Sequence, residues 1–255
     1  MSKQAATTGT TRPAVLVVTG GSRGIGAALS VAAAARGYAV CVNYRGDSRK
    51  AESVVAKIEA EGGRAIAVKA DIGDENDVVR LFETVDRDLG RVTALVNNAG
   101  IIGDRGPVDS VTGATVAAVM QTNVVGAFLC AREALKRMLP RHGGDGGVIV
   151  NVSSAAARLG GAGRTVHYAA SKGAMNSFTI GLAREVANQR VRVNAVAPGV
   201  IDTEIQEPGW LEKVVSAIPM GRPGAVKEVA AAVLWLLSDD ASYVSGAVID
   251  VSGAR

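Results

Sequence analysis

Residues 15–26 read Val-Leu-Val-Val-Thr-Gly-Gly-Ser-Arg-Gly-Ile-Gly. An apolar, β-branched run is followed by three spaced glycines and then by helix-forming residues, which predicts a buried parallel strand turning sharply into a helix. Gly20, Gly24 and Gly26 lack a Cβ, which would let a diphosphate lie against their backbone at the helix N-terminus. Leu29 stands where the G-x-G-x-x-G motif has its third glycine, and a tight turn with a purely structural role is the alternative. The order of strand, glycines and helix favours phosphate binding.

Strand and helix signals alternate from this turn to the end of the chain, with short connections, which forces a parallel sheet with helices on both faces. Residues 14–255 are therefore expected to form a single doubly wound α/β domain behind a flexible tail, residues 1–13. A switch of strand order after the first strand would place a ligand crevice at the carboxyl ends of the strands. The expected strands are 15–19, 38–43, 64–69, 93–96, 148–152, 192–197 and 247–251, and the expected helices are 25–36, 48–60, 75–89, 116–139 (one long or broken helix), 168–188 and 227–237.

The composition is that of a globular protein. Of the 255 residues, 48% are hydrophobic and 20% are charged, which excludes a disordered chain. The longest strongly apolar stretch, 229–237, is too short to span a bilayer, and residues 1–13 lack the apolar core of a secretion signal. Cys41 and Cys130 stand in apolar segments, where reduced thiols are favoured over a disulfide. We therefore expect a cytoplasmic protein with no membrane partner.

The charge pattern argues against nucleic-acid binding. The formal net charge is +4, but the positive residues are interleaved with Asp and Glu without a run of four or more. Only 4% of the residues are aromatic, too few for a base-stacking surface. A mildly basic surface suits an anionic cofactor or substrate just as well, so no nucleic-acid partner is expected.

Four polar residues converge on the predicted crevice. Ser154 follows the fifth expected strand, and Asn123 lies in the middle of the long helical region. Tyr168 and Lys172 stand four residues apart, which puts both side chains on one helix face. Taken alone, this pair is better explained as a half-buried aromatic and a solvated charge.

The complete set of motifs resembles the short-chain dehydrogenase/reductase family over 15–253. This resemblance implies a seven-stranded Rossmann-type sheet, a nicotinamide cofactor and a carbonyl or secondary alcohol substrate. The motifs that carry it are, in order, Thr19-Gly20-x-x-x-Gly24-x-Gly26, Asn97-Asn98-Ala99-Gly100, Asn123, Ser154, Tyr168-x-x-x-Lys172 and Pro198-Gly199.

The resemblance assigns a catalytic role to each of the four polar residues. Tyr168 would be the general acid in carbonyl reduction and the general base in alcohol oxidation, and Ser154 would polarise the substrate oxygen. A free phenol has a pKa of about 10, so work near neutrality requires a drop of some three units. Lys172 and a positive nicotinamide ring are expected to supply it, and the lysine would also bind the nicotinamide ribose. Asn123 would hold a water that links Lys172 to bulk solvent.

The loop before Tyr168 departs from the family pattern. Ser154 and Tyr168 stand fourteen positions apart, one more than is common in the family. Ala155 occupies the usual position but has no hydroxyl, so Ser154 is retained as the working serine, with Ser153 as a supporting neighbour. We interpret His167 as a residue of the pocket wall.

Cofactor preference is expected to depend on the end of the second strand. An NAD enzyme usually has Asp or Glu there, about twenty residues past the glycines. Here Tyr44 and Arg45 stand at this point, and Arg23 lies inside the glycine turn. Guanidinium groups suit phosphate oxygens, so NADP(H) is preferred and NAD(H) is possible; solvated surface charges are the alternative. Asp47 is a possible loop acid.

The resemblance also implies the remaining cofactor contacts. Asp71, with Ile72, matches the family's adenine-binding aspartate, although a helix N-terminal cap explains Asp71 about equally well. No metal site is expected. The full set of implied cofactor contacts is Gly20, Ser22, Arg23, Gly24, Ile25, Gly26, Tyr44, Arg45, Asp71, Ile72, Asn97, Ala99, Gly100, Tyr168, Lys172, Pro198, Gly199, Ile201 and Thr203.

The substrate is less closely defined. The segment 167–173 and the triplet 43–45 look like the sugar dehydrogenase branch, and a general carbonyl reductase or a 3-oxoacyl-carrier-protein reductase are the other enzymatic hypotheses. A non-catalytic NADP(H) sensor is the alternative of another class. The segment 204–216 would be the substrate lid. Family members form tetramers, so a homo-oligomer is expected, although the ending 251–255 departs from the common family sequence.

Overall fold

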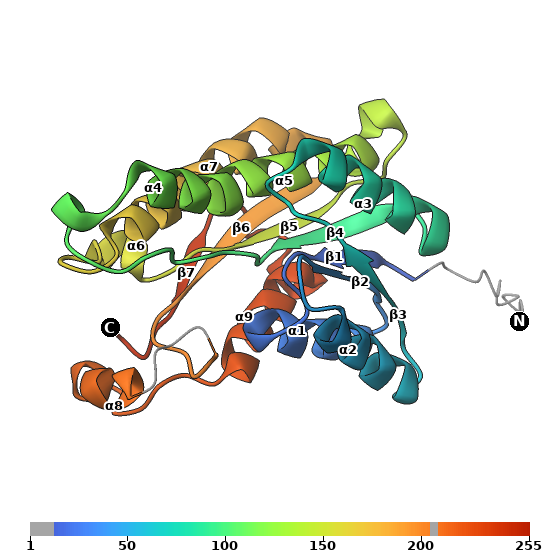
Figure 1. The fold of residues 1–255 in the computed structure, drawn as a ribbon. Coiled ribbons are helices and arrows are strands. Elements are labelled where there is room, and N and C mark those ends of the chain that lie inside the picture. Colours follow the sequence, from blue (N-terminus) through green and yellow to red (C-terminus); the bar gives the residue numbers. More distant parts are fainter. Residues whose placement is uncertain (1–12, 205–208) are drawn as a thin grey trace, which may run out of the picture.

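The computed structural model describes residues 13–204 and 209–255, so almost all of the expected N-terminal tail lies outside the described residues. The centre is a seven-stranded parallel sheet in the order β3-β2-β1-β4-β5-β6-β7 (Figure 1). The chain runs outward from β1 to β3 and then returns to β4 on the other side of β1, so the switch in strand order lies between β1 and β4, beside the first strand as predicted. The strands are β1 (Val15–Val18), β2 (Ala39–Tyr44), β3 (Arg64–Lys69), β4 (Val92–Asn97), β5 (Gly147–Val152), β6 (Val191–Pro198) and β7 (Val248–Val251).

Helices cover both faces of the sheet, which confirms the doubly wound α/β class (Figure 1). One face carries α1 (Gly24–Ala34), α2 (Ser48–Ala60) and α9 (Val226–Leu237). The other face carries α3 (Glu75–Asp88), α4 (Gly113–Met120), α5 (Gly126–Met138) and α7 (Val166–Val186).

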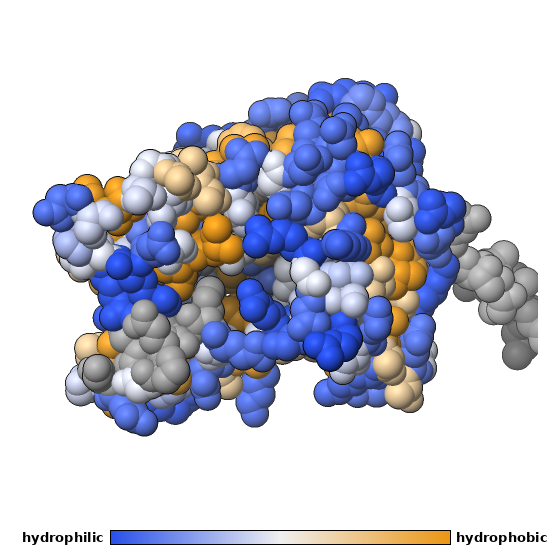
Figure 2. Space-filling view, viewed as in Figure 1, coloured by the Kyte–Doolittle hydropathy of each residue, from blue (hydrophilic) through white to orange (hydrophobic). Residues whose placement is uncertain are grey.

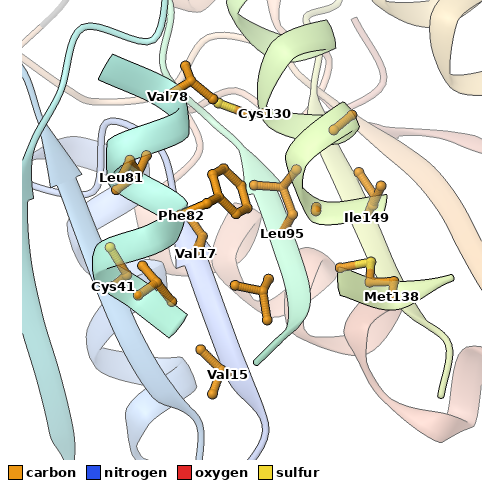
Figure 3. Close-up of a cluster of buried hydrophobic side chains, with 14 of the residues drawn as sticks. Val15, Val17, Cys41, Val78, Leu81, Phe82, Leu95, Cys130, Met138 and Ile149 are labelled. Atoms are coloured by element: carbon orange, nitrogen blue, oxygen red, sulfur yellow. The ribbon is translucent and has the colours of Figure 1, made fainter. Parts of the chain in front are cut away.

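Both faces of the sheet are apolar because neither meets water. Along β1, Val15 and Val17 belong to the core under α3 and α5, whereas Leu16 and Val18 belong to the core under α1 and α9. Phe82 of α3 is fully buried in the first of these cores (Figure 3). Burial of a side chain of this size stabilises the fold by about 1.5–3 kcal/mol.

The long helical region differs from a regular helix. It begins at α4, where the Thr112 side chain caps the helix by accepting a hydrogen bond from the backbone N–H of Thr115. A π-helical turn, Gln121–Val125, joins α4 to α5. The continuous segment Gly113–Met138 is long and apolar enough to cross a membrane by length and composition alone, but α5 packs against β4 and α3, where Cys130 and other residues are buried.

The remaining differences lie at element ends. Helix α1 ends at Ala34, so Gly37 lies in the turn beyond its cap residue, Ala35. Helix α7 begins at Val166, two residues before the expected start. Two short helices have no counterpart in the prediction, α6 (Ala156–Leu159) and α8 (Trp210–Val214), because one helical turn is too short to show a hydrophobic period.

Candidate active site

A cleft of about 800 Å³ opens at the carboxyl ends of the strands. It is lined by the glycine turn after β1, by the ends of β2, β4, β5 and β6, and by α6 and α7. Figure 2 views the face of the molecule where hydrophilic side chains surround a hollow with apolar side chains inside it. A volume of this size suits a ligand as large as a dinucleotide.

The Thr19 side chain holds the glycine turn against the segment that follows β4. The hydroxyl of Thr19 accepts hydrogen bonds from the backbone N–H groups of Asn98 and Ala99, at 3.0 and 3.1 Å. Gly20 has a φ of 61°, which favours glycine, and a Cβ there would lie 3.0 Å from the Cα of Ala99. A Cβ on Gly26 would lie 2.4 Å from the carbonyl oxygen of Gly20, so this glycine permits the turn itself to close.

Ser154, Tyr168 and Lys172 meet at one end of the cleft. The hydroxyls of Ser154 and Tyr168 are hydrogen-bonded, and the Lys172 ammonium lies 5.7 Å from the centroid of the Tyr168 ring. The ammonium donates to the carbonyl of Val152 at 2.8 Å. Ser153 is buried and contacts the backbone carbonyl of Lys172 at 3.1 Å, so it fixes α7 against β5.

The electrostatics of the pair differ from expectation. Burial raises the pKa of Tyr168, and the hydrogen bond with Ser154 offsets part of that rise. Burial lowers the pKa of Lys172 to about 8. The expected depression of the phenol pKa is therefore absent from the protein alone, because desolvation of the phenolate is the dominant effect on Tyr168.

Asn123 stands in the π-helical turn, behind the cleft lining. Its side-chain oxygen accepts from the N–H of Ile101 at 2.8 Å, and its side-chain nitrogen donates to the carbonyl of Ile101 at 2.9 Å. A Cβ on Gly100 would lie 3.3 Å from the Asn123 oxygen and 3.4 Å from the Lys172 nitrogen. Asn123 thus pins the loop after β4, and its polar oxygen shares the space beside Gly100 with the ammonium.

The longer loop before Tyr168 folds into α6 and a turn rich in left-handed glycines. Gly160, Gly161 and Gly163 have φ values of 78°, 64° and 69°, which lets the chain absorb the additional residue without displacing Ser154. His167 is buried and its Nε2 contacts the carbonyl of Ile102 at 2.9 Å. Its interpretation as a pocket-wall residue is wrong, because the ring lies behind the lining.

Cations gather at the other end of the cleft, where Arg23, Arg45 and Lys50 are lining residues. The Arg45 guanidinium lies 3.7 Å from the carboxylate of Asp71. Asp47 caps α2 by accepting from the backbone N–H of Lys50 at 3.2 Å.

Asp71 has two predicted roles, an adenine-binding residue and a helix N-terminal cap. The cap of α3 is Asp74, so the cap interpretation of Asp71 is wrong. Asp71 itself lines the cleft, where its carboxylate accepts from the N–H of Gly73 at 2.9 Å.

Most of the predicted site residues line this one cleft. Three do not: Gly26, Asn97 and Asn123. Asn97 lies beneath the cleft and donates to Asn151 at 2.9 Å. The predicted residues in the lining are Gly20, Ser22, Arg23, Gly24, Ile25, Tyr44, Arg45, Asp71, Ile72, Ala99, Gly100, Ser154, Tyr168, Lys172, Pro198, Gly199, Ile201 and Thr203.

Several lining residues escaped the sequence-based prediction. Asn98 follows the strand end and donates to the carbonyls of Thr19 and Gly20, at 2.9 and 3.0 Å. Its place in the Asn97–Gly100 motif was the available signal. Lys50, Arg105 and Arg164 also line the cleft, but they stand among dispersed surface charges with no pattern that distinguishes them. Among the described residues, no group of three or more His, Cys, Asp or Glu side chains is arranged to hold a metal ion.

Comparison with known proteins agrees with this geometry. The family model described as enoyl-(acyl carrier protein) reductase matches residues 20–253. A double mutant of the Serratia marcescens short-chain dehydrogenase/reductase superposes with a TM-score of 0.89 at 31% identity, covering 94% of this chain and 97% of that one. The chain belongs to the short-chain dehydrogenase/reductase family. It is therefore an oxidoreductase of that type.

Three further proteins are similar to this chain over nearly its whole length. The uncharacterized oxidoreductase YgfF of Escherichia coli is 50% identical over 95% of this chain and 100% of its own length. A 3-oxoacyl-[acyl-carrier-protein] reductase of Synechocystis is 40% identical over 94% and 95%. A blue fluorescent protein from a metagenomic library, solved in complex with NADPH, has a TM-score of 0.87 at 36% identity, covering 94% of this chain and 97% of that one.

Proposed function

We propose that this protein is an NADP(H)-dependent oxidoreductase that reversibly transfers hydride between the nicotinamide and a carbonyl or secondary alcohol substrate. The observation that carries the proposal is one continuous cleft with Ser154, Tyr168 and Lys172 at one end and Arg23 and Arg45 at the other. A hydride-transfer site needs a proton donor beside the reacting carbon, and a phosphorylated dinucleotide needs cations at its far end.

The residues present fit a dinucleotide. The backbone of Gly20 and Gly24 lines the cleft without side chains, beside the N-terminus of α1, which favours a diphosphate. Asp71, Ala99 and Gly100 line the stretch proposed for adenosine, and Pro198, Gly199, Ile201 and Thr203 line the stretch proposed for nicotinamide. The NADPH complex of a structural neighbour supports the same cofactor here.

The chain's own residues would handle the proton. When bound, the nicotinamide cofactor supplies or accepts the hydride. In reduction, the Ser154 hydroxyl donates a hydrogen bond to the substrate carbonyl oxygen, and Tyr168 delivers a proton to that oxygen as the carbon gains the hydride. Lys172 then stands beside the phenolate that Tyr168 becomes and favours its negative charge. In oxidation, the same phenolate takes the alcohol proton.

For the substrate we propose a sugar-like or general carbonyl compound. Ser154 and Tyr168 require only a carbonyl or alcohol oxygen, and the apolar Ile102 and Leu159 line the same end of the cleft. A 3-oxoacyl-carrier-protein reductase is a second candidate, supported by the name of the Synechocystis relative and by Arg105 and Arg164 in the lining, since carrier proteins of this kind are acidic partners.

A panel of ketones, sugars and 3-oxoacyl thioesters, followed by the absorbance of NADPH, tests the proposal. We expect turnover with at least one carbonyl class and a preference for NADPH over NADH. Cofactor binding without turnover of any member would favour a non-catalytic NADP(H) sensor. Failure to bind NADPH would contradict the proposal as a whole.

We also propose a homotetramer that works in the cytoplasm. Family resemblance supports the assembly, and the partly exposed Phe128, stacked on Phe178 with ring centroids 3.8 Å apart, supplies an apolar surface on the helices of one face. Two free, buried cysteines, Cys41 and Cys130, suit a reducing compartment. Light scattering coupled to size exclusion measures the mass directly, and a monomer would contradict the assembly proposal.

A further inference from the structure

Lys50 stands where a helix disfavours a cation. It lies in the first turn of α2, where the capping Asp47 is the one carboxylate at the helix start, and the positive end of the helix dipole repels an ammonium there. The side chain lines the cleft together with Arg23 and Arg45. These three cations outnumber the two carboxylates, Asp47 and Asp71, that line the cleft near the start of α2. A further anion at that point would offset the excess positive charge and the dipole.

Glu204 already supplies one such anion. Its carboxylate lies 2.6 Å from the Lys50 nitrogen, the distance of a charge-assisted hydrogen bond. Lys50 lowers the pKa of Glu204 through this hydrogen bond and its charge, Arg23 lowers it further, and Asp47 raises it. The two partners come from segments 154 residues apart in the chain, so the pair ties α2 to the segment that follows β6.

The segment that carries Glu204 also borders the cofactor path. Ile201 and Thr203 line the cleft, and the Thr203 methyl lies 3.7 Å from the position that a Cβ on Gly24 would take. Glu204 is thus adjacent in the chain to a residue beside the glycine turn.

We propose that the Glu204 carboxylate occupies the place of the cofactor's 2′-phosphate, and that Lys50 exchanges this carboxylate for the phosphate when NADP(H) binds. The inference rests on the proposed function. A phosphate carries nearly two charges and three acceptor oxygens, so it satisfies Lys50, Arg23 and Arg45 together, whereas the carboxylate bonds one of them. The side chains of Lys50 and Glu204 are 43% and 62% exposed, and breaking an ion pair this exposed costs little.

The exchange makes Lys50 and Glu204 specificity residues. A 2′-hydroxyl is neutral and does not displace a carboxylate from an ammonium, so NAD(H) would leave the pair intact. NADP(H) alone would release Glu204 from α2. Lys50 thus favours the 2′-phosphate. The free energy needed to displace the Glu204 carboxylate from Lys50 lowers the affinity for NADP(H).

The test is calorimetric titration of the whole protein with 2′,5′-ADP and with 5′-AMP, which differ only in the 2′-phosphate. We expect Lys50→Gln to weaken 2′,5′-ADP binding about tenfold and Glu204→Gln to strengthen it about two- to fivefold, with 5′-AMP binding unchanged in both. Arg49→Gln and Glu52→Gln are matched controls, because both residues are exposed on α2 and neither lines the cleft.

The outcomes separate this inference from the proposed function. Unchanged 2′,5′-ADP affinity in Lys50→Gln would overturn the inference, as would weaker binding in Glu204→Gln. Loss of 5′-AMP binding in Glu204→Gln would also overturn it, because Glu204 would then serve the adenosine rather than compete with the phosphate. Wild-type protein that binds neither NADPH nor 2′,5′-ADP would instead contradict the proposed function.

Discussion

Lys172 carries a charge that is costly to bury. The residue is 4% exposed, and its ammonium donates a hydrogen bond to the Val152 carbonyl, a neutral acceptor. Burial therefore lowers its pKa to about 8. A neutral side chain of the same shape would be cheaper to bury, so the buried cation supports the proposed catalytic role of Lys172.

This depressed pKa predicts a pH dependence of stability. An unfolded lysine titrates near about 10.4, so between about pH 8 and pH 10 the unfolded state binds more protons and the wild type gains stability as pH rises. Relative to Lys172→Met, the wild-type free energy of unfolding should therefore rise by roughly 3 kcal/mol or less across that window. Urea unfolding of both proteins at several pH values measures it. A difference independent of pH would contradict the assigned pKa shift.

Arg45 tests cofactor preference at the same scale. The Arg45→Asp variant should lose about tenfold or more in NADPH affinity, because a cation facing the phosphate is replaced by a carboxylate. The new carboxylate should favour the 2′-hydroxyl of NADH. Arg45→Gln is the control, expected to weaken NADPH without a gain in NADH. Steady-state kinetics with both cofactors decide the matter, and retained NADPH preference in Arg45→Asp would refute the assignment.

At the scale of elements, the glycine turn depends on close backbone packing. Gly26 contacts the turn so tightly that an added Cβ would meet the Gly20 carbonyl and the Asn98 amide, at 2.4 and 2.6 Å. Both neighbours are held by hydrogen bonds, since the Asn98 amide donates to the carbonyls of Thr19 and Gly20. The turn therefore has little room to relax.

Replacement of Gly26 by Ala is expected to destabilise the fold by about 1–3 kcal/mol through overpacking and to weaken NADPH binding. Gly181 in α7 is the control: no atom lies within 4 Å of its potential Cβ, so Gly181→Ala should stabilise by about 0.5–1 kcal/mol. Chemical denaturation of the two variants measures both effects. Equal stability of Gly26→Ala and wild type would show that the turn is looser than described.

The elements were predictable because buried parallel strands and glycine-ended helices leave strong local patterns. The directions of the side chains at the strand ends were not predictable. Successive strand residues point to opposite faces, and β4 continues through Asn97, one residue past its expected end. Asn97 therefore enters the interior beside Asn151, and Asn98 borders the cleft. The direction of the His167 side chain was not predictable either. Helix α7 begins at Val166, before the expected start, and the His167 ring lies against the carbonyl of Ile102.

For the whole molecule, the switch in strand order between β1 and β4 brings distant segments to one cleft. The sheet topology places three segments around this cleft: the Tyr168–Lys172 helix, the glycine turn and the segment with Glu204. Motifs predicted the first two of these. The Lys50–Glu204 pair was invisible in the sequence, because an ion pair between exposed charges far apart in the chain leaves no local pattern.

The proposed function depends above all on Tyr168 as the residue that transfers the proton in a carbonyl reduction. The most direct measurement is kcat/KM of the wild type and of Tyr168→Phe on the best carbonyl substrate of the panel, with NADPH affinity measured for both. We expect a loss of about 10²–10⁴-fold in kcat/KM, with NADPH affinity nearly unchanged. Full activity in Tyr168→Phe with NADPH still bound would contradict this role of Tyr168.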